Sequence, residues 1–128
     1  MYVVTFYSFK GGVGRSMALI NVAAELARRG KRVIVVDFDL EAPGLDTFDI
    51  TRSEECRKGL LEFVCDFRES ARVPDVKEYV YQAKVDLGDG QLWVMPAGLQ
   101  DDDYTTAFVP LTGQIFTLGS TGFFCSRT

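Results

Sequence analysis

The chain contains 128 residues, of which 47 % are hydrophobic and 25 % are charged. This length and composition are typical of one globular domain and exclude a chain that is disordered throughout. The 14 basic and 18 acidic residues give a net charge of −4, so the composition provides no electrostatic signal for nucleic acid. Histidine is absent, which excludes serine–histidine and cysteine–histidine nucleophiles and histidine-ligated metal sites.

The first part of the chain predicts a strand, a helix and a second strand. Residues 3–9 are β-branched and aromatic, as in a buried strand. Residues 16–29 repeat apolar side chains at i, i+3 and i+4 on one helix face, and Gly30 follows as a helix-ending residue. Residues 32–38 form a continuous apolar run, which is typical of a parallel strand buried on both faces. This order predicts a βαβ unit with its ligand at the carboxyl ends of the strands.

Later segments predict further elements of an α/β domain. Residues 40–57 contain proline, glycine and mixed charges and predict a loop. Residues 58–68 and 74–83 predict two short helices, the second with a proline near its start. Residues 91–96 predict another strand.

The three cysteines, Cys56, Cys65 and Cys125, match no metal-binding or redox spacing. Because three is also an odd number for a disulfide framework, we expect reduced thiols of an intracellular protein. The chain opens without the basic segment of a signal peptide, and no apolar stretch approaches the roughly 18 residues of a membrane span. These features predict a cytoplasmic protein and give no signal for a membrane partner.

The strongest functional signal is the glycine-rich segment between the first predicted strand and helix, Lys10-Gly11-Gly12-Val13-Gly14-Arg15-Ser16. Glycines permit positive φ angles and close approach of a ligand, so successive backbone N–H groups can form an anion nest. The N-terminus of the following helix adds partial positive charge at the same point. The hydroxyl of Ser16 suits Mg²⁺. The segment therefore predicts a polyphosphate-binding loop, and the alternative is a glycine-rich turn without a ligand.

Two acids, Asp37 and Asp39, follow at the end of the second predicted strand. The carboxyl ends of parallel strands face the same crevice as a phosphate-binding loop. At i, i+2 both side chains can point to one side of an extended strand. Phosphoryl transfer needs a positioned nucleophile and charge neutralisation, which such carboxylates can support. The alternative is a pair of solvated acids, the interpretation that we give to neighbouring Glu41 and Asp46.

The run FYSFKGGVGRSMALINVAAELARRGKRVIVVDFDLEAPGLD resembles the ParA/MinD-type deviant Walker A ATPases, and among them the variant group that has KGGVGR in place of KGGVGK. The resemblance covers residues 1–104. It implies an α/β P-loop NTPase fold, a three-layer arrangement of a mostly parallel sheet and flanking helices, which is incomplete on its C-terminal side. It also implies ATP and Mg²⁺ as cofactors, a homodimer formed through the nucleotide, and a further protein partner of unknown identity.

The same resemblance implies roles for individual residues. Lys10 is the signature lysine, which reaches the phosphates of the opposite subunit in the dimer. Arg15 keeps the positive charge of the usual lysine on a planar fork, and we expect Lys10, Arg15 and Asp39 to take part in catalysis. Asp39 orients the attacking water, and Ser16, Asp37 and Asp39 hold Mg²⁺. The expected nucleotide-binding residues are Lys10, Gly11, Gly12, Val13, Gly14, Arg15, Ser16 and Met17.

The tail, residues 105–128, differs from the rest of the chain. It is rich in threonine, glycine and phenylalanine and follows neither a strand nor a helix period. The apolar strand ending in aspartate that the family places next, the Walker B strand, is not recognisable after residue 104. Codons compatible with residues 111–128, read in a shifted frame, permit a sequence that resembles the downstream part of the KGGVGR group. We infer a frameshift near residues 105–111 and an aberrant tail.

The sequence therefore favours an ATPase switch of the ParA/MinD type whose dimerisation depends on nucleotide. The alternative is a nucleotide-binding module that does not hydrolyse its ligand, or an inactive truncated fragment without the Walker B strand. A dinucleotide oxidoreductase is weakly supported, because residues 10–15 break the G-x-G-x-x-G spacing.

Overall fold

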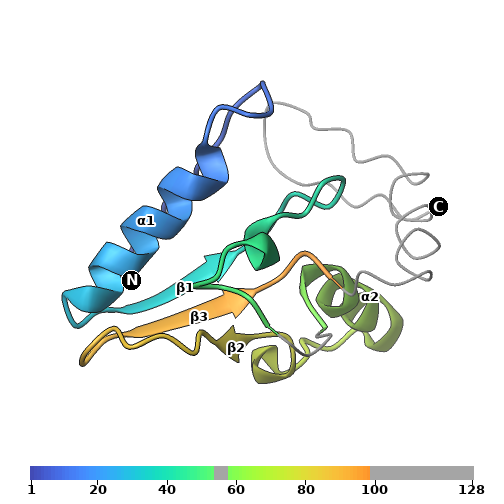
Figure 1. The fold of residues 1–128 in the computed structure, drawn as a ribbon. Helices are drawn as coiled ribbons and strands as arrows, with labels where there is room; N and C mark the ends of the chain where they lie inside the picture. The colour runs from blue at the N-terminus through green and yellow to red at the C-terminus, as the bar shows by residue number, and fades with distance from the viewer. Residues whose placement is uncertain (54–57, 99–128) are drawn as a thin grey trace.

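The computed structural model describes residues 1–53 and 58–98. In chain order the elements are α1 (Arg15–Arg28), β1 (Arg32–Val36), the 3₁₀ helix η1 (Leu45–Thr47), α2 (Leu60–Ser70), the 3₁₀ helix η2 (Val76–Glu78), β2 (Tyr81–Gln82) and β3 (Gln91–Met95). Figure 1 shows α1 lying along the sheet and α2 beyond the end of β3. The α/β class is confirmed, as are the two predicted helices 16–29 and 58–68 and the predicted strand 91–96, within about two residues.

The strands form one sheet in the order β1-β3-β2. β1 and β3 are parallel over five pairs, from Arg32 opposite Gln91 to Val36 opposite Met95. The amide of Asp37 extends this ladder by donating to the carbonyl of Met95 at 3.0 Å. β2 adds a short antiparallel pairing to the other edge of β3. The sheet is therefore mixed, with five parallel pairs and two antiparallel ones, which agrees with the predicted mostly parallel sheet.

Helix α1 packs on one face of the β1–β3 pair through small side chains. Ala23 and Ala27 belong to the same buried cluster as Val35 and Leu92. A Cβ atom at Gly90 would lie 1.8 Å from the carbonyl oxygen of Ala27, so only glycine allows the helix this close to the start of β3. This contact and the packing of Ile20, Ala23 and Ala27 on the sheet hold α1 in place.

Helix α2 is anchored at the carboxyl end of β3. The amides of Leu60 and Leu61 donate to the carbonyls of Pro96 and Ala97, both at 2.9 Å. Glu62 completes the helix start by accepting from the amide of Gly59 at 2.6 Å. The first two amides of α2 are therefore satisfied by the protein itself.

The predicted strand over residues 3–9 is wrong. Residues 1–8 have no strand structure, and among the described strands β1 pairs only with β3, so no neighbour accepts the backbone hydrogen bonds of this segment. Most of its apolar side chains are consequently exposed, and Phe9 is 94 % exposed. Tyr7 and Phe9 pack edge to face on each other, with ring centroids 5.3 Å apart. The expected βαβ unit is reduced to its helix and second strand.

The prediction that the second strand is buried on both faces is also wrong. β1 ends at Val36, two residues earlier than expected. Val35 faces α1 and is 2 % exposed, whereas Ile34 is 53 % exposed on the opposite face. The apolar run indicated burial correctly for one face only, because no described element covers the other face at Ile34.

The predicted helix over residues 74–83 is wrong as well. This segment contains only the single turn η2, followed by β2. Asp75 caps the start of this turn by accepting from the amide of Lys77 at 3.1 Å. The turn ends at Tyr79, whose amide donates to the carbonyl of Val76 at 3.0 Å. Tyr81 then pairs with β3, and the aromatic and β-branched composition around it favours a strand once a partner is available.

Within the described segments no helix has the length and apolar character needed to cross a membrane. Cys65 on α2 is a free, half-buried thiol, and burial raises its pKa. Cys56, Cys125 and the predicted aberrant tail over residues 105–128 lie outside the described residues.

We predict that Gly90→Ala lowers the free energy of unfolding by about 1–3 kcal/mol, because the added methyl group overlaps the backbone of Ala27 and α1 must move. Gly44→Ala is the control, since a Cβ atom there would meet only the carbonyl oxygen of Ala42, at 3.9 Å. Urea unfolding followed by circular dichroism measures both variants. Equal stability of the two would contradict the close approach of α1 to β3.

A second prediction concerns Tyr79, a buried side chain whose hydroxyl donates to the carboxylate of Asp66. This hydrogen bond raises the pKa of Tyr79 from 10.0 to about 12 and lowers the pKa of Asp66. The pKa of this phenol is higher in the folded state than in the unfolded state. The hydrogen bond therefore stabilises the fold fully below pH 10.0, and this stabilisation is lost as the pH rises towards about 12.

We therefore expect Asp66→Asn to return the pKa of Tyr79 towards 10.0, since the neutral amide no longer opposes tyrosinate formation. An ultraviolet absorbance titration of tyrosinate measures this change. Glu69→Gln on the same helix is the control and should leave the titration unaltered. A Tyr79 pKa that stays high in Asp66→Asn would show that another group sets it.

Candidate functional site

The glycine-rich loop immediately precedes α1 and adopts the conformation that its sequence predicts. Gly12 and Gly14 have φ angles of 72° and 78°, in the left-handed region that disfavours side chains. Gly14 is the N-cap of α1, and its carbonyl accepts the first helical hydrogen bond, from Ala18 at 2.9 Å. Alternation of left-handed and ordinary residues is the backbone pattern of an anion-binding nest.

Hydrogen-bond donors and positive charge concentrate on this loop. In the part of the chain that the structure describes, the amides of Gly11, Gly12 and Gly14 donate to no other protein group, and residues 11–14 are all exposed. Lys10 is exposed at the start of the loop. Together with the N-terminus of α1 these groups form an electropositive surface suited to an anion.

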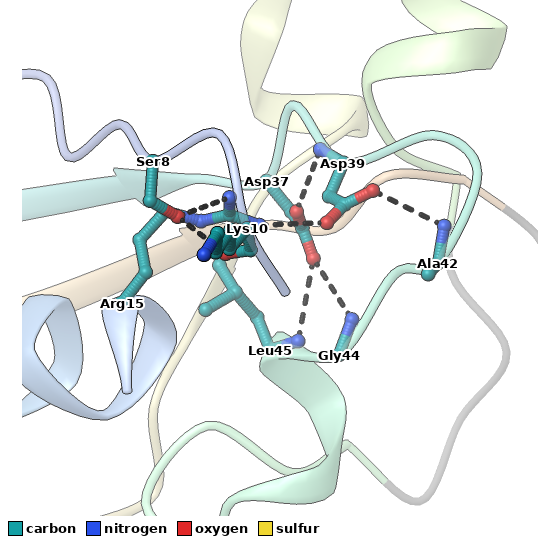
Figure 2. A network of polar contacts seen from close by, with 8 residues as sticks. All are labelled: Ser8, Lys10, Arg15, Asp37, Asp39, Ala42, Gly44 and Leu45. Atoms are coloured by element: carbon teal, nitrogen blue, oxygen red, sulfur yellow. Dashed lines mark hydrogen bonds and ion pairs between the residues drawn. The ribbon is translucent and has the colours of Figure 1, made fainter. Parts of the chain in front are cut away.

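Arg15, the first residue of α1, joins the loop to the segment after β1. Its Nη2 atom lies 2.8 Å from Oδ2 of Asp39, and its Nη1 donates to Oγ of Ser8 at 3.2 Å. Ser8 in turn donates to the carbonyl of Lys10 at 3.0 Å. Figure 2 shows the guanidinium between these two partners. The pair of side chains is partly accessible, with 30 % of Arg15 and 36 % of Asp39 exposed.

Asp37 organises the loop after β1, residues 37–45. It is 8 % exposed, and its carboxylate accepts from the amides of Asp39 at 3.0 Å, Gly44 at 3.2 Å and Leu45 at 3.3 Å. In the same loop Oδ1 of Asp39 accepts a hydrogen bond from the amide of Ala42 at 3.1 Å (Figure 2). Buried carboxylates are stable when such donors surround them, so Asp37 serves the loop conformation first.

The remaining predicted site residues lie in the first turn of α1. Ser16 is half-buried and Met17 is exposed. The hydroxyl of Ser16 and the carboxylate of Asp39 are oxygen donors of the kind that Mg²⁺ prefers, and Mg²⁺ is normally held by one or two protein ligands with phosphate and water. These two residues fit the ion, whereas both oxygens of Asp37 already accept backbone hydrogen bonds. Among residues 1–53 and 58–98 no group of three or more acidic or cysteine side chains is arranged to hold a metal.

The structure thus brings Lys10, Arg15, Asp37 and Asp39 into one region, as Figure 2 shows. Sequence reasoning misses Ser8, because a serine inside an apolar run matches no motif. It also misses the direct contact of Arg15 with Asp39, although the expected meeting of the strand end with the loop implied that they are neighbours. Glu41 and Asp46 are exposed, in agreement with their interpretation as surface charges.

Comparison with known proteins supports the motif assignment. A family model described as "AAA domain" matches residues 1–100. The septum site-determining protein MinD of Helicobacter pylori is 52 % identical over 44 residues, which are 34 % of this chain and 16 % of the relative. The chromosome-partitioning ATPase Soj of Thermus thermophilus is 63 % identical over 30 residues, 23 % of this chain and 12 % of the relative.

A longer match is an uncharacterized ATP-binding protein of Methanocaldococcus jannaschii, 29 % identical over 109 residues, which are 85 % of this chain and 36 % of the relative. Across these three relatives the chain spans between 12 % and 36 % of their length. No solved structure matches the chain significantly. The family match over residues 1–100 shows that this chain belongs to the AAA domain family, and with its relatives it identifies the N-terminal region of a ParA/MinD-type P-loop ATPase.

Proposed function

We propose that this chain binds ATP and Mg²⁺ at residues 10–17 and acts in a nucleotide-dependent switch of the ParA/MinD type. The observation that supports this most strongly is the loop itself, in which Gly12 and Gly14 are left-handed at the start of α1. Exposed amides and the cations Lys10 and Arg15 accompany it, a combination that binds polyphosphate groups. The M. jannaschii relative is named an ATP-binding protein.

In this proposal each group has a separate task. The amides of residues 11–14 and the guanidinium of Arg15 bind phosphate oxygens, and Ser16 and Asp39 hold the metal. Bound Mg²⁺ supplies neutralisation of the charge on the phosphate oxygens. Asp39 also orients the attacking water, while Asp37 supports it by holding the backbone of residues 37–45.

The association state and the whole protein's activity belong to the same proposal. Lys10 projects from the exposed loop, and we propose that it reaches the nucleotide of a second copy, so that ATP promotes a homodimer. Hydrolysis would then release a protein partner in the cytoplasm. Residues 1–104 would be the first part of the nucleotide-binding domain, and residues 105–128 the product of a frameshift, which the nucleotide sequence across codons 105–111 tests.

A nucleotide-binding module without turnover is the second candidate. The engagement of both acids favours it, since Asp37 holds backbone amides and Asp39 is bound to Arg15. Both candidates bind nucleotide, and release of inorganic phosphate from ATP separates them.

We expect saturable MgATP binding by the full chain in isothermal titration calorimetry, and a roughly tenfold or greater loss in Ser16→Ala because a metal ligand is removed. The loss should vanish when binding is measured in EDTA, where the hydroxyl has no ion to hold. Ser70→Ala, an exposed serine at the end of α2, is the control. Failure of the unaltered chain to bind MgATP would overturn the proposed function.

We expect Lys10→Ala to weaken ATP-dependent dimerisation by about tenfold or more, because an intersubunit charge contact is lost. The affinity of one chain for ATP should change much less, since residues 11–16 remain. Analytical ultracentrifugation with and without ATP measures the first quantity and calorimetry the second. Lys31→Ala, at the opposite end of α1, is the charge-matched control. A larger loss of ATP binding than of dimerisation would contradict the intersubunit role of Lys10.

A further inference from the structure

Arg15, the cation proposed to bind phosphate, already holds an anion of the protein. Its Nη2 lies 2.8 Å from Oδ2 of Asp39, and Nη1 donates to Ser8 at 3.2 Å. The two contacts differ in kind. Ser8 is a neutral acceptor on the chain leading into the loop, whereas Asp39 is a carboxylate from the segment after β1 (Figure 2). Asp39 therefore occupies a position on Arg15 that a ligand anion would need.

The carboxylate does not depend on Arg15 for its placement. Its other oxygen accepts from the amide of Ala42 at 3.1 Å, and the amide of Asp39 donates to Asp37 at 3.0 Å. Asp37 in turn holds Gly44. Because residues 37–45 have these internal bonds, breaking the ion pair to Arg15 leaves the loop supported. The ion pair can thus be exchanged without unfolding the segment.

The exchange favours a phosphate over the carboxylate. The pair is partly exposed, 30 % for Arg15 and 36 % for Asp39, and ion pairs in such positions are weak. A guanidinium donates to carboxylate and to phosphate oxygens in the same forked geometry. A polyphosphate brings more negative charge, and it also reaches the loop amides of residues 11–14, which Asp39 does not contact.

We propose that Asp39 is a positioning residue that acts as an internal competing anion on Arg15 until a phosphate group displaces it. This inference rests on the proposed nucleotide binding and adds two consequences. The site binds nucleotide less tightly than it would if Arg15 had no carboxylate partner. The carboxylate of Asp39 becomes free to hold the metal or orient water only when a phosphate has replaced it on Arg15.

The test measures ADP binding by calorimetry in EDTA, which removes the role of Asp39 as a metal ligand. Asp39→Asn should bind ADP about three- to fivefold more tightly than the unaltered chain, because the competing ion pair is gone. Asp39→Ser keeps an acceptor for the amide of Ala42 and should show the same gain. Glu41→Gln removes an equal charge two residues away and should change the affinity by less than about twofold.

A second background separates competition from simple charge repulsion. Arg15→Gln has no guanidinium for Asp39 to occupy. Adding Asp39→Asn to this variant should therefore raise its ADP affinity by no more than adding Glu41→Gln does. An equal gain in both backgrounds would overturn the competition, as would an Asp39→Asn variant that binds ADP no better than the unaltered chain. If the unaltered chain binds MgATP but neither it nor either Asp39 variant binds ADP in EDTA, Asp39 is not what limits phosphate binding and this inference fails. Only loss of MgATP binding by the unaltered chain overturns the proposed function itself.

Discussion

The close packing of α1 on the β1–β3 pair determines where every proposed site residue lies. Gly90 permits this contact because it has no Cβ atom to meet the carbonyl of Ala27. The parallel register of β1 with β3 continues to Asp37, whose amide donates a hydrogen bond to the carbonyl of Met95. The N-terminus of the helix and the end of the strand are thereby set beside each other, and Arg15 can reach across to the acids.

The two acids after β1 are similar in sequence and different in physical role. Asp37 is buried, and the three backbone amides from which it accepts satisfy its carboxylate and shape residues 37–45. Asp39 is more accessible and shares its carboxylate between Ala42 and Arg15. A fixed acid thus supports an exchangeable one, an arrangement suited to a loop that must respond to an arriving anion.

Much of the fold follows from local pattern, and the failures have a common cause. The helices α1 and α2 and the strand β3 were predictable from periodicity and from their end signals. The pattern of residues 3–9 predicts a strand equally well, but a strand exists only where a neighbour accepts its hydrogen bonds. Ile34 is exposed for a related reason, since a side chain is buried only where another element covers it. In residues 74–83 the availability of β3 as a partner overrides the helix-like spacing.

The sequence alone determined the phosphate loop, because its conformation depends on local properties: glycines that accept positive φ at positions 12 and 14, followed by a helix start. It also determined that acids follow the next strand. Only the tertiary structure decided how these parts meet. Arg15 and Asp39 are 24 residues apart, and their contact depends on the packing of α1 against the sheet. No local pattern contains that information, since an ion pair between distant segments is set by the geometry of the elements that bear it.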